Sequence, residues 1–319
     1  MFYSLETAGV DSAKTMMSKD DEKAMSILEK CTIQRADGHY VHYVQMPNSY
    51  DMALKRFTCL EKKLKNDCNL NDIFNKTISE YISKGYITKI ANDRITSTKE
   101  KKVWYLPIFP VFNKDKPGKT RIVWDAAARA HGTSLNDMLM KGPDMLCSLP
   151  SILIRFREKA IAICGDIEQM FHQVFIREED RNAQRFLWRG ESDGEPDVYV
   201  MNVMIFGASC SPCISQYVKN INADKFISKY PTAAAAIKNN HYVDDYLDSV
   251  DTVEEAITLA QNVKYIHGMA GFNIRNWICN NKSVLAAMND SNGRQQKSLN
   301  LGNEIEIEKV LGVFLEIIR

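Results

Sequence analysis

The spacing of apolar residues predicts two consecutive helices in the first third of the chain. Residues 49–65 (SYDMALKRFTCLEKKLK) have the pattern of a basic amphipathic helix, and a second helix follows over 70–85 (LNDIFNKTISEYISKG). Gly85 supplies the stop signal of the second helix. The apolar face of this helix is predicted to consist of Leu70, Ile73, Phe74, Ile78, Tyr81 and Ile82.

The first 48 residues are polar, rich in Met and only weakly patterned, which favours an N-terminal extension over a domain. A short helix is predicted over 18–30, with Ser18 at its cap and acidic residues in its first turn. Residues 38–47 alternate well enough for one strand, which Pro47 ends.

The rest of the chain mixes strands with helices. Residues 104–124 carry apolar β-formers on both sides of a Pro-Gly turn, which predicts a hairpin. The other predicted elements are a helix feeding a buried strand over 152–166, two strands over 186–204, a helix over 211–229, a strand pair over 241–250, a helix over 252–271 and a final strand over 309–319. Because the two kinds of element do not alternate strictly, the pattern predicts the α+β class.

The composition is that of an ordinary globular protein, with 45% hydrophobic and 25% charged residues and a net charge of +1. A chain of 319 residues is long enough for one large core or two modest domains. No apolar run approaches the roughly 20 residues that cross a bilayer, and the N-terminus has no signal-peptide pattern, so no membrane span and no secretion are expected. The eight cysteines follow no framework pattern, which predicts free thiols in a reducing compartment.

The strongest local feature is a pair of carboxylates, Asp244 and Asp245, inside the apolar β-pattern of YVDDYLD. Two adjacent charges there are costly without a cation or hydrogen bonds, because like charges and burial both disfavour ionisation. An exposed turn is the plainer interpretation, since Asp is a common turn residue. Taken alone, the motif does not decide between the two.

A third carboxylate, Asp166, ends the apolar strand of AIAICGDIEQMF. If this strand meets the Asp-Asp hairpin, the three carboxylates can hold two Mg²⁺ ions, which prefer few carboxylates together with phosphates and water. Two such ions about 4 Å apart can activate a 3′-hydroxyl and stabilise a pyrophosphate leaving group. The alternative for Asp166 alone is a helix N-cap.

A basic hairpin turn, KDKPGKTRIVWDAAAR, carries Lys114, Lys116, Lys119 and Arg121 within eight residues. Such a hairpin can clamp a triphosphate and follow a phosphate backbone. A solvated turn is the usual alternative for a run of charges.

Weaker signals favour structural roles. Cys210 and Cys213 lack a second ligand pair, so buried thiols are preferred over a zinc site. His241 is interpreted as a strand residue, and Asp248 as a solvent-facing strand position rather than a neighbour of the carboxylate site. Trp104, Trp124, Trp188 and Trp277 are predicted to lie in the core.

These motifs, in this order, resemble the reverse transcriptases of long-terminal-repeat retroelements, and most specifically those of Pao/BEL retrotransposons. The resemblance runs from about Ser49 to the last residue. It rests on five motifs: KDKPGKTRIVWDA of the fingers hairpin, GDIEQMFHQV of the first catalytic strand, FGASCSP on the template side, YVDD of the catalytic hairpin and KVLGVFLE of the primer grip.

The resemblance implies a role for each matching position. Asp166, Asp244 and Asp245 are the implied catalytic carboxylates and metal ligands, with the carbonyl of Ile167 as a further ligand. Phe206 stands where retroviral enzymes carry Gln, and Phe there fits the Pao/BEL class. The implied substrate-binding residues are Lys114 and Arg121 on the triphosphate, Phe171 as steric gate under the sugar, and Phe206, Gly207, Ser211 and Pro212 around the nucleotide and template; Leu311 and Gly312 are the implied primer grip.

A core aromatic is the alternative for Phe171, and a plain helix start is the alternative for the Ser211-Pro212 pair. The gate would work because a flat ring under the sugar collides with a 2′-hydroxyl.

The resemblance also implies a right-hand polymerase fold with fingers and palm subdomains. Its implied boundaries are an N-terminal extension over 1–48, fingers over 49–140 and 175–208, and palm over 141–174 and 209–319. No thumb, connection or RNase H segment is expected after the primer grip, so the sequence is interpreted as a piece of a larger pol polyprotein.

The implied function is RNA-directed DNA polymerase, with two Mg²⁺ ions (or Mn²⁺) as cofactor. The implied partners are an RNA or DNA template, a primer, deoxynucleoside triphosphates and the rest of the polyprotein. The expected location is the cytoplasm, in a virus-like particle of the element, or the nucleus. The alternative is a catalytically silent retrotransposon remnant that only binds nucleic acid.

Overall fold

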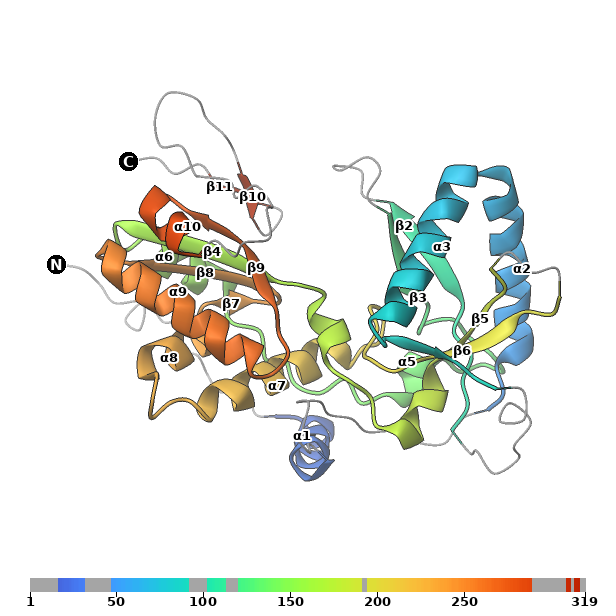
Figure 1. The fold of residues 1–319 in the computed structure, drawn as a ribbon. Coiled ribbons are helices and arrows are strands. Elements are labelled where there is room, and N and C mark those ends of the chain that lie inside the picture. The colour runs from blue at the N-terminus through green and yellow to red at the C-terminus, as the bar shows by residue number, and fades with distance from the viewer. Residues whose placement is uncertain are drawn as a thin grey trace.

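The computed structural model of the chain describes residues 17–31, 47–91, 102–112, 120–190, 194–288, 308–310 and 313–315. Its elements form two lobes, which lie side by side in Figure 1. The strand predicted over 38–47 lies outside the described residues except for Pro47. The helix predicted over 18–30 is present as α1 (Lys19–Cys31), and the Ser18 hydroxyl caps it by accepting a hydrogen bond from the Asp21 N–H at 3.1 Å.

The first lobe packs two helices against a small antiparallel sheet (Figure 1). Helices α2 (Tyr50–Asn66) and α3 (Cys68–Ser83) confirm the two predicted amphipathic helices. The sheet has the order β1-β6-β5, with β1 Ile87–Lys89, β6 Asp197–Met201 and β5 Arg185–Trp188. Gly85 ends α3 as predicted, because it adopts a left-handed φ of +70° that other residues rarely take.

The predicted basic hairpin is present in the first lobe as β2 (Ile108–Phe112) and β3 (Thr120–Trp124). The strands pair antiparallel, from Ile108 opposite Trp124 to Phe112 opposite Thr120. Trp124 is fully buried at the base of the hairpin, which anchors the hairpin in the core. The turn itself, residues 113–119, lies outside the described residues.

The second lobe is built on a four-stranded sheet of order β7-β8-β4-β9. Its strands are β4 (Ile161–Ile167), β7 (His241–Tyr242), β8 (Asp245–Val250) and β9 (Ile274–Cys279). Both faces of the central strand β4 are apolar. Ala162 and Cys164 pack toward helix α6, whereas Ile163 and Ile167 belong to the main core on the opposite face.

Helices cover this sheet on both faces. Helix α6 (Leu149–Phe156) contacts β8 and β7 on one face, and α9 (Val253–Gly268) contacts β4, β8 and β9 on the other. Helix α9 begins at a capping box formed by Thr252 and Glu255. The remaining elements are α5 (Leu135–Met138), η2 (Met170–Gln173), η3 (Glu178–Gln184), α7 (Ser211–Asp224), α8 (Pro231–Asn239), α10 (Lys282–Met288), β10 (Glu308–Val310) and β11 (Val313–Leu315).

The mixture of helices and sheets confirms the α+β class, and most other predictions of structure hold. The four tryptophans are buried, and the seven cysteines that the structure describes are free thiols. Burial raises the pKa of the Cys213 thiol to about 11 and of the Cys210 thiol to about 12, which fits inert structural thiols. In the described part of the chain, no helix is long and apolar enough to cross a membrane.

Three predictions of structure are wrong. Ile82 is 48% exposed rather than part of the apolar face, because it lies in the last turn of α3, just before the chain leaves the helix. The segment predicted as one final strand forms two short antiparallel strands, β10 and β11. Asp248 is buried, because helices cover both faces of the sheet and the Tyr246 hydroxyl donates a hydrogen bond to its carboxylate at 2.8 Å.

Candidate active site

The backbone brings the predicted carboxylates to one end of the four-stranded sheet. Strands β4 and β8 are antiparallel neighbours, and their register places Asp166 directly opposite Asp245. The N–H of Ile167 donates to the carbonyl oxygen of Asp244 at 2.9 Å, which ties the turn of the hairpin to the end of β4. Residues about 80 positions apart in the sequence therefore share one site because of strand register alone.

The turn that carries Asp244 is strained, and a hydrogen bond from helix α7 holds it in place. Val243 has a left-handed φ of +56°, which is unfavourable for a β-branched residue. The buried side chain of Gln216 on α7 donates to the Val243 carbonyl oxygen at 2.9 Å. Sequence reasoning missed Gln216, and its only local signal is a polar residue on the inward face of a helix.

Asp166 is not a helix cap. Its carboxylate lies at the end of β4 and accepts a hydrogen bond from the Asn276 amide on β9 at 2.6 Å. Asn276 is a second residue of the site that sequence reasoning missed.

The carboxylates repel one another. Burial, then the charges of Asp244 and Asp166, raise the pKa of Asp245 to about 7. The pKa of Asp244 is also raised, chiefly by burial and further by the charge of Asp166, while Arg121 acts in the opposite direction. The site therefore concentrates negative charge that a cation would neutralise.

The unfolding free energy of the protein in EDTA is expected to carry a pH-dependent contribution from Asp245. Since the pKa rises from 3.8 to about 7 on folding, the folded state holds a proton that the unfolded state has released between these values. This contribution to the free energy of unfolding is fully present below pH 3.8 and is lost as the pH rises through the pKa of the folded state. After allowance for solvent screening, the loss is about 1–3 kcal/mol.

The measurement is urea unfolding of the wild type and Asp245→Asn at about pH 5 and about pH 8. The variant should gain stability relative to the wild type at the higher pH. A difference between the two proteins that is the same at both pH values would contradict the assignment.

The donor set fits a hard divalent cation, although the side chains do not form a finished site. Among the described residues, no group of three or more His, Cys, Asp or Glu side chains is arranged to hold a metal ion. The fit rests on carboxylate oxygens, on their mutual repulsion and on the nearby carbonyl of Ile167. The strand register thus brings the carboxylates to one place, and their side chains are not arranged around an ion.

Phe171, the predicted steric gate, is half-buried beside the end of β4, in η2. Its ring lies 4.8 Å from the ring of Phe206, and the fully buried His172 lies 5.1 Å from the same ring. Two separate segments, η2 and the loop before α7, therefore form one aromatic cluster. Phe206 backs the Phe171 ring.

The FGASCSP loop is held by backbone contacts. Gly207 has a φ of +116°, and the Asn136 amide donates to its carbonyl oxygen at 3.0 Å. The N–H of Ser209 returns a hydrogen bond to the Asn136 side chain at 2.8 Å. Ser211 is fully buried and donates to the Ile205 carbonyl oxygen, whereas Pro212 is exposed in the first turn of α7.

Gly207→Ala is expected to destabilise the fold by about 1–3 kcal/mol through backbone strain, and by more if the loop cannot shift. An added Cβ would lie 2.5 Å from the Trp124 carbonyl oxygen. Thermal unfolding measures the effect. Gly268→Ala is the matched control, because a Cβ there meets open space at the end of a helix; equal melting temperatures for the two variants would contradict the prediction.

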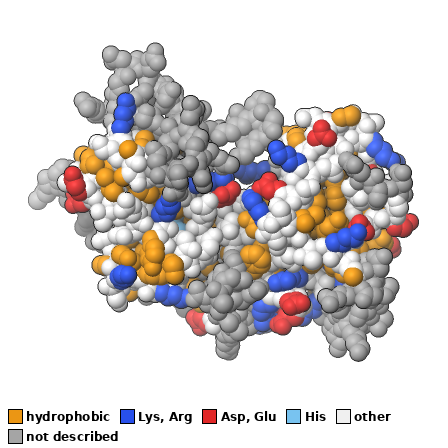
Figure 2. Space-filling view, in the orientation of Figure 1, with side chains coloured by type: hydrophobic (Ala, Val, Ile, Leu, Met, Phe, Trp, Pro, Cys, Tyr) orange, Lys and Arg blue, Asp and Glu red, His pale blue; other side chains and the backbone are white. Residues whose placement is uncertain are grey.

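Arg121 of the basic hairpin acts electrostatically on the carboxylate site. It is exposed on β3, and its charge lowers the pKa of the Asp244 carboxyl, against the larger effect of burial. Figure 2 shows acidic and basic side chains together between the two lobes. Lys114, Leu311 and Gly312 lie outside the described residues.

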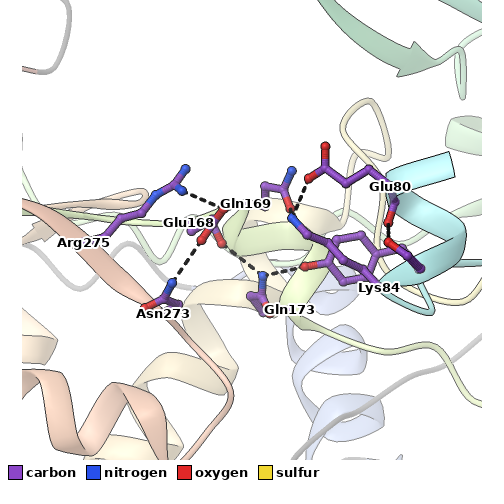
Figure 3. A network of polar contacts seen from close by, with 9 residues as sticks. Glu80, Lys84, Glu168, Gln169, Gln173, Asn273 and Arg275 are labelled. Carbon is purple, nitrogen blue, oxygen red and sulfur yellow. Dashed lines mark hydrogen bonds and ion pairs between the residues drawn. The ribbon is translucent and has the colours of Figure 1, made fainter. Parts of the chain in front are cut away.

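A polar network joins the two lobes beside the site (Figure 3). Glu168, two residues after Asp166, pairs with Arg275 at 2.6 Å and accepts from the Asn273 amide at 3.0 Å. On the other side, Lys84, the residue directly after α3, donates to the Gln169 side chain at 3.3 Å. The segment that follows Asp166 is therefore tied both to β9 and to the first lobe.

One comparison with known proteins gives a match. Residues 113–289, more than half of the chain, match the family described as reverse transcriptase (RNA-dependent DNA polymerase). No curated protein matches the sequence. The family match implies the palm and fingers fold of a polymerase, and a nucleic-acid template and nucleotides as substrates. The chain belongs to the reverse transcriptase family.

Proposed function

We propose that this chain is the fingers-and-palm core of a reverse transcriptase from a Pao/BEL-class retrotransposon. In this proposal it extends a primer on an RNA or DNA template by two-metal nucleotidyl transfer. The observation that carries the proposal is the strand register, which sets Asp166 opposite Asp245 with Asp244 in the adjoining turn. The order of the sequence motifs supports the Pao/BEL class.

Asp166, Asp244, Asp245 and the Ile167 carbonyl would hold two Mg²⁺ ions, or Mn²⁺. When bound, these ions supply Lewis-acid stabilisation of the charge that develops as the primer 3′-oxygen bonds to the α-phosphorus and pyrophosphate leaves. The protein's own contribution is to hold the carboxylates close together at one edge of a rigid sheet. Their mutual repulsion favours occupancy by a cation.

Other residues would position the nucleotide. Arg121, whose charge reaches Asp244, would pair with the triphosphate together with Lys114 of the same hairpin. Phe171, backed by Phe206, would lie under the sugar and exclude a 2′-hydroxyl. Gly207, Ser211 and Pro212 would shape the pocket. Ser211 would do so through its backbone, because its side chain is buried.

The segment boundaries are part of the proposal. Fingers would comprise 49–140 and 175–208, and palm 141–174 and 209–319, with Leu311 and Gly312 as primer grip. The expected partners are the template, the primer, deoxynucleoside triphosphates and the rest of the pol polyprotein. The expected location is the cytoplasm, in virus-like particles, or the nucleus.

The test is extension of a DNA primer on an RNA template by the purified chain with Mg²⁺ and all four deoxynucleotides, beside Asp244→Asn. Extension by the wild type alone supports the proposal. If both proteins bind the duplex and neither extends the primer, the binding-only alternative replaces it.

A further inference from the structure

A β-bulge lies directly beside Asp166. Strand β9 pairs with β4 through Cys164 and Ile278, and then through Asp166 and Arg275. One residue of β4, Gly165, therefore faces two residues of β9, Asn276 and Trp277. Bulges next to active sites re-aim a side chain.

The conformation of this bulge turns Asn276 and Trp277 in different directions. Asn276 has a left-handed φ of +52°, which Asn tolerates better than most residues. Trp277 is buried in the core, and it packs so close that a Cβ on Gly165 would lie 3.3 Å from its ring. Asn276 is exposed on the surface of the sheet, at the site.

The Asn276 side chain is aimed at the Asp166 carboxylate. Its amide nitrogen donates to Asp166 Oδ1 at 2.6 Å. A neighbouring side chain of β9 therefore holds the Asp166 carboxylate in place.

Contacts on the N-terminal side fix the position of the bulge. The Glu168 N–H donates to the Asn273 carbonyl oxygen at 2.8 Å, and Arg275 pairs with Glu168 (Figure 3). These contacts hold β9 in register with the segment that follows Asp166. Asn276 is thus held beside the carboxylate by the contacts of Asn273 and Arg275 before it and by the buried Trp277 after it.

We propose that Asn276 is a positioning residue, which holds Asp166 in the conformer that binds a divalent cation. The inference rests on the proposed function, since it assigns Asp166 as a metal ligand. A neutral amide suits the task because it offsets part of the repulsion among the carboxylates without adding a positive charge that would repel the cation. Its hydrogen bond is to one oxygen of Asp166, Oδ1.

The test compares Asn276→Gly with Asn280→Gly. Glycine keeps the left-handed backbone at 276 and removes only the amide. Asn280 lies on the same side of β4, where its side chain donates to the Ala160 carbonyl oxygen at 2.8 Å and does not touch Asp166. Asn280 directly follows β9 and also accepts a hydrogen bond from the Ala162 N–H of β4 at 3.0 Å, so both variants lose a side-chain contact with the β4 segment and Asn280→Gly controls for lost stability.

The first readout is Mn²⁺ affinity of the protein without substrate, from the electron paramagnetic resonance signal of free Mn²⁺. Asn276→Gly should weaken binding about ten- to a hundredfold, the usual range for a hydrogen-bonding partner of a metal ligand. The second readout is primer extension, in which kcat should fall with the nucleotide KM nearly unchanged. Asn280→Gly should match the wild type in both. If Asn276→Gly does not fold, Asn276→Asp keeps the size and lacks the donor, and its kcat should fall at least tenfold.

The inference is overturned if Asn276→Gly keeps wild-type Mn²⁺ affinity, if both glycine variants lose affinity equally, or if the wild type binds no Mn²⁺. Failure of the proposed function looks different: the wild type would then bind Mn²⁺ and add no nucleotide.

Discussion

Asp166→Asn is expected to reduce primer extension by about a thousandfold, while the protein keeps its fold. The change preserves shape and removes one charge from the site. Several kcal/mol of transition-state charge stabilisation depend on the metal ions, and each 1.36 kcal/mol corresponds to a factor of ten in rate. The measurement is the single-turnover rate of extension with saturating primer–template and nucleotide.

The melting temperature of this variant in EDTA should be equal to or above that of the wild type, because the Asp166 charge is one cause of the raised pKa of Asp245. Asp251→Asn is the matched control, since Asp251 is 64% exposed just past the far end of β8, where it pairs with Lys159. A rate loss in Asp166→Asn no greater than in Asp251→Asn would refute the assignment of Asp166.

Phe171→Val is expected to raise ribonucleotide incorporation relative to deoxynucleotide incorporation by about ten- to a hundredfold. A steric contact of this size is typically worth 1–3 kcal/mol of discrimination. The ring of Phe171 is held by Phe206 at 4.8 Å, so it cannot turn aside without losing that contact. The measurement is the ratio of kcat/KM for one deoxynucleotide and its ribonucleotide.

This ratio is insensitive to the fraction of folded protein, because both nucleotides are tested on the same sample. Phe171→Tyr is the control, since it keeps a flat ring and should keep the discrimination. An unchanged ratio in Phe171→Val would show that Phe171 is a core aromatic, the alternative that the sequence left open.

The sequence predicted the parts of the site that depend on strand patterns. Asp166 follows a continuous apolar strand, and Asp244 and Asp245 interrupt another, so each lies at the end of a buried element. Antiparallel pairing then brings them together. The helices α2, α3 and α9 could be predicted equally well from the sequence, because their apolar residues repeat with the helical period.

The supporting residues were not predictable in this way. Gln216, Asn136 and Asn276 act on residues 27 or more positions away, and no local pattern marks their partners. The left-handed conformations at Val243 and Asn276 are imposed by tertiary contacts against local preference. Asp248 was misjudged for a related reason: the strand pattern does not reveal that helices cover both faces of the sheet.

The most direct test of the account is incorporation of a single deoxynucleotide opposite a defined RNA template base, as that base is varied. We predict that the purified chain with Mg²⁺ adds only the complementary nucleotide and releases pyrophosphate, and that Asp244→Asn and EDTA each abolish the addition. Addition that does not depend on the template base, or no addition by the wild type, would contradict the account.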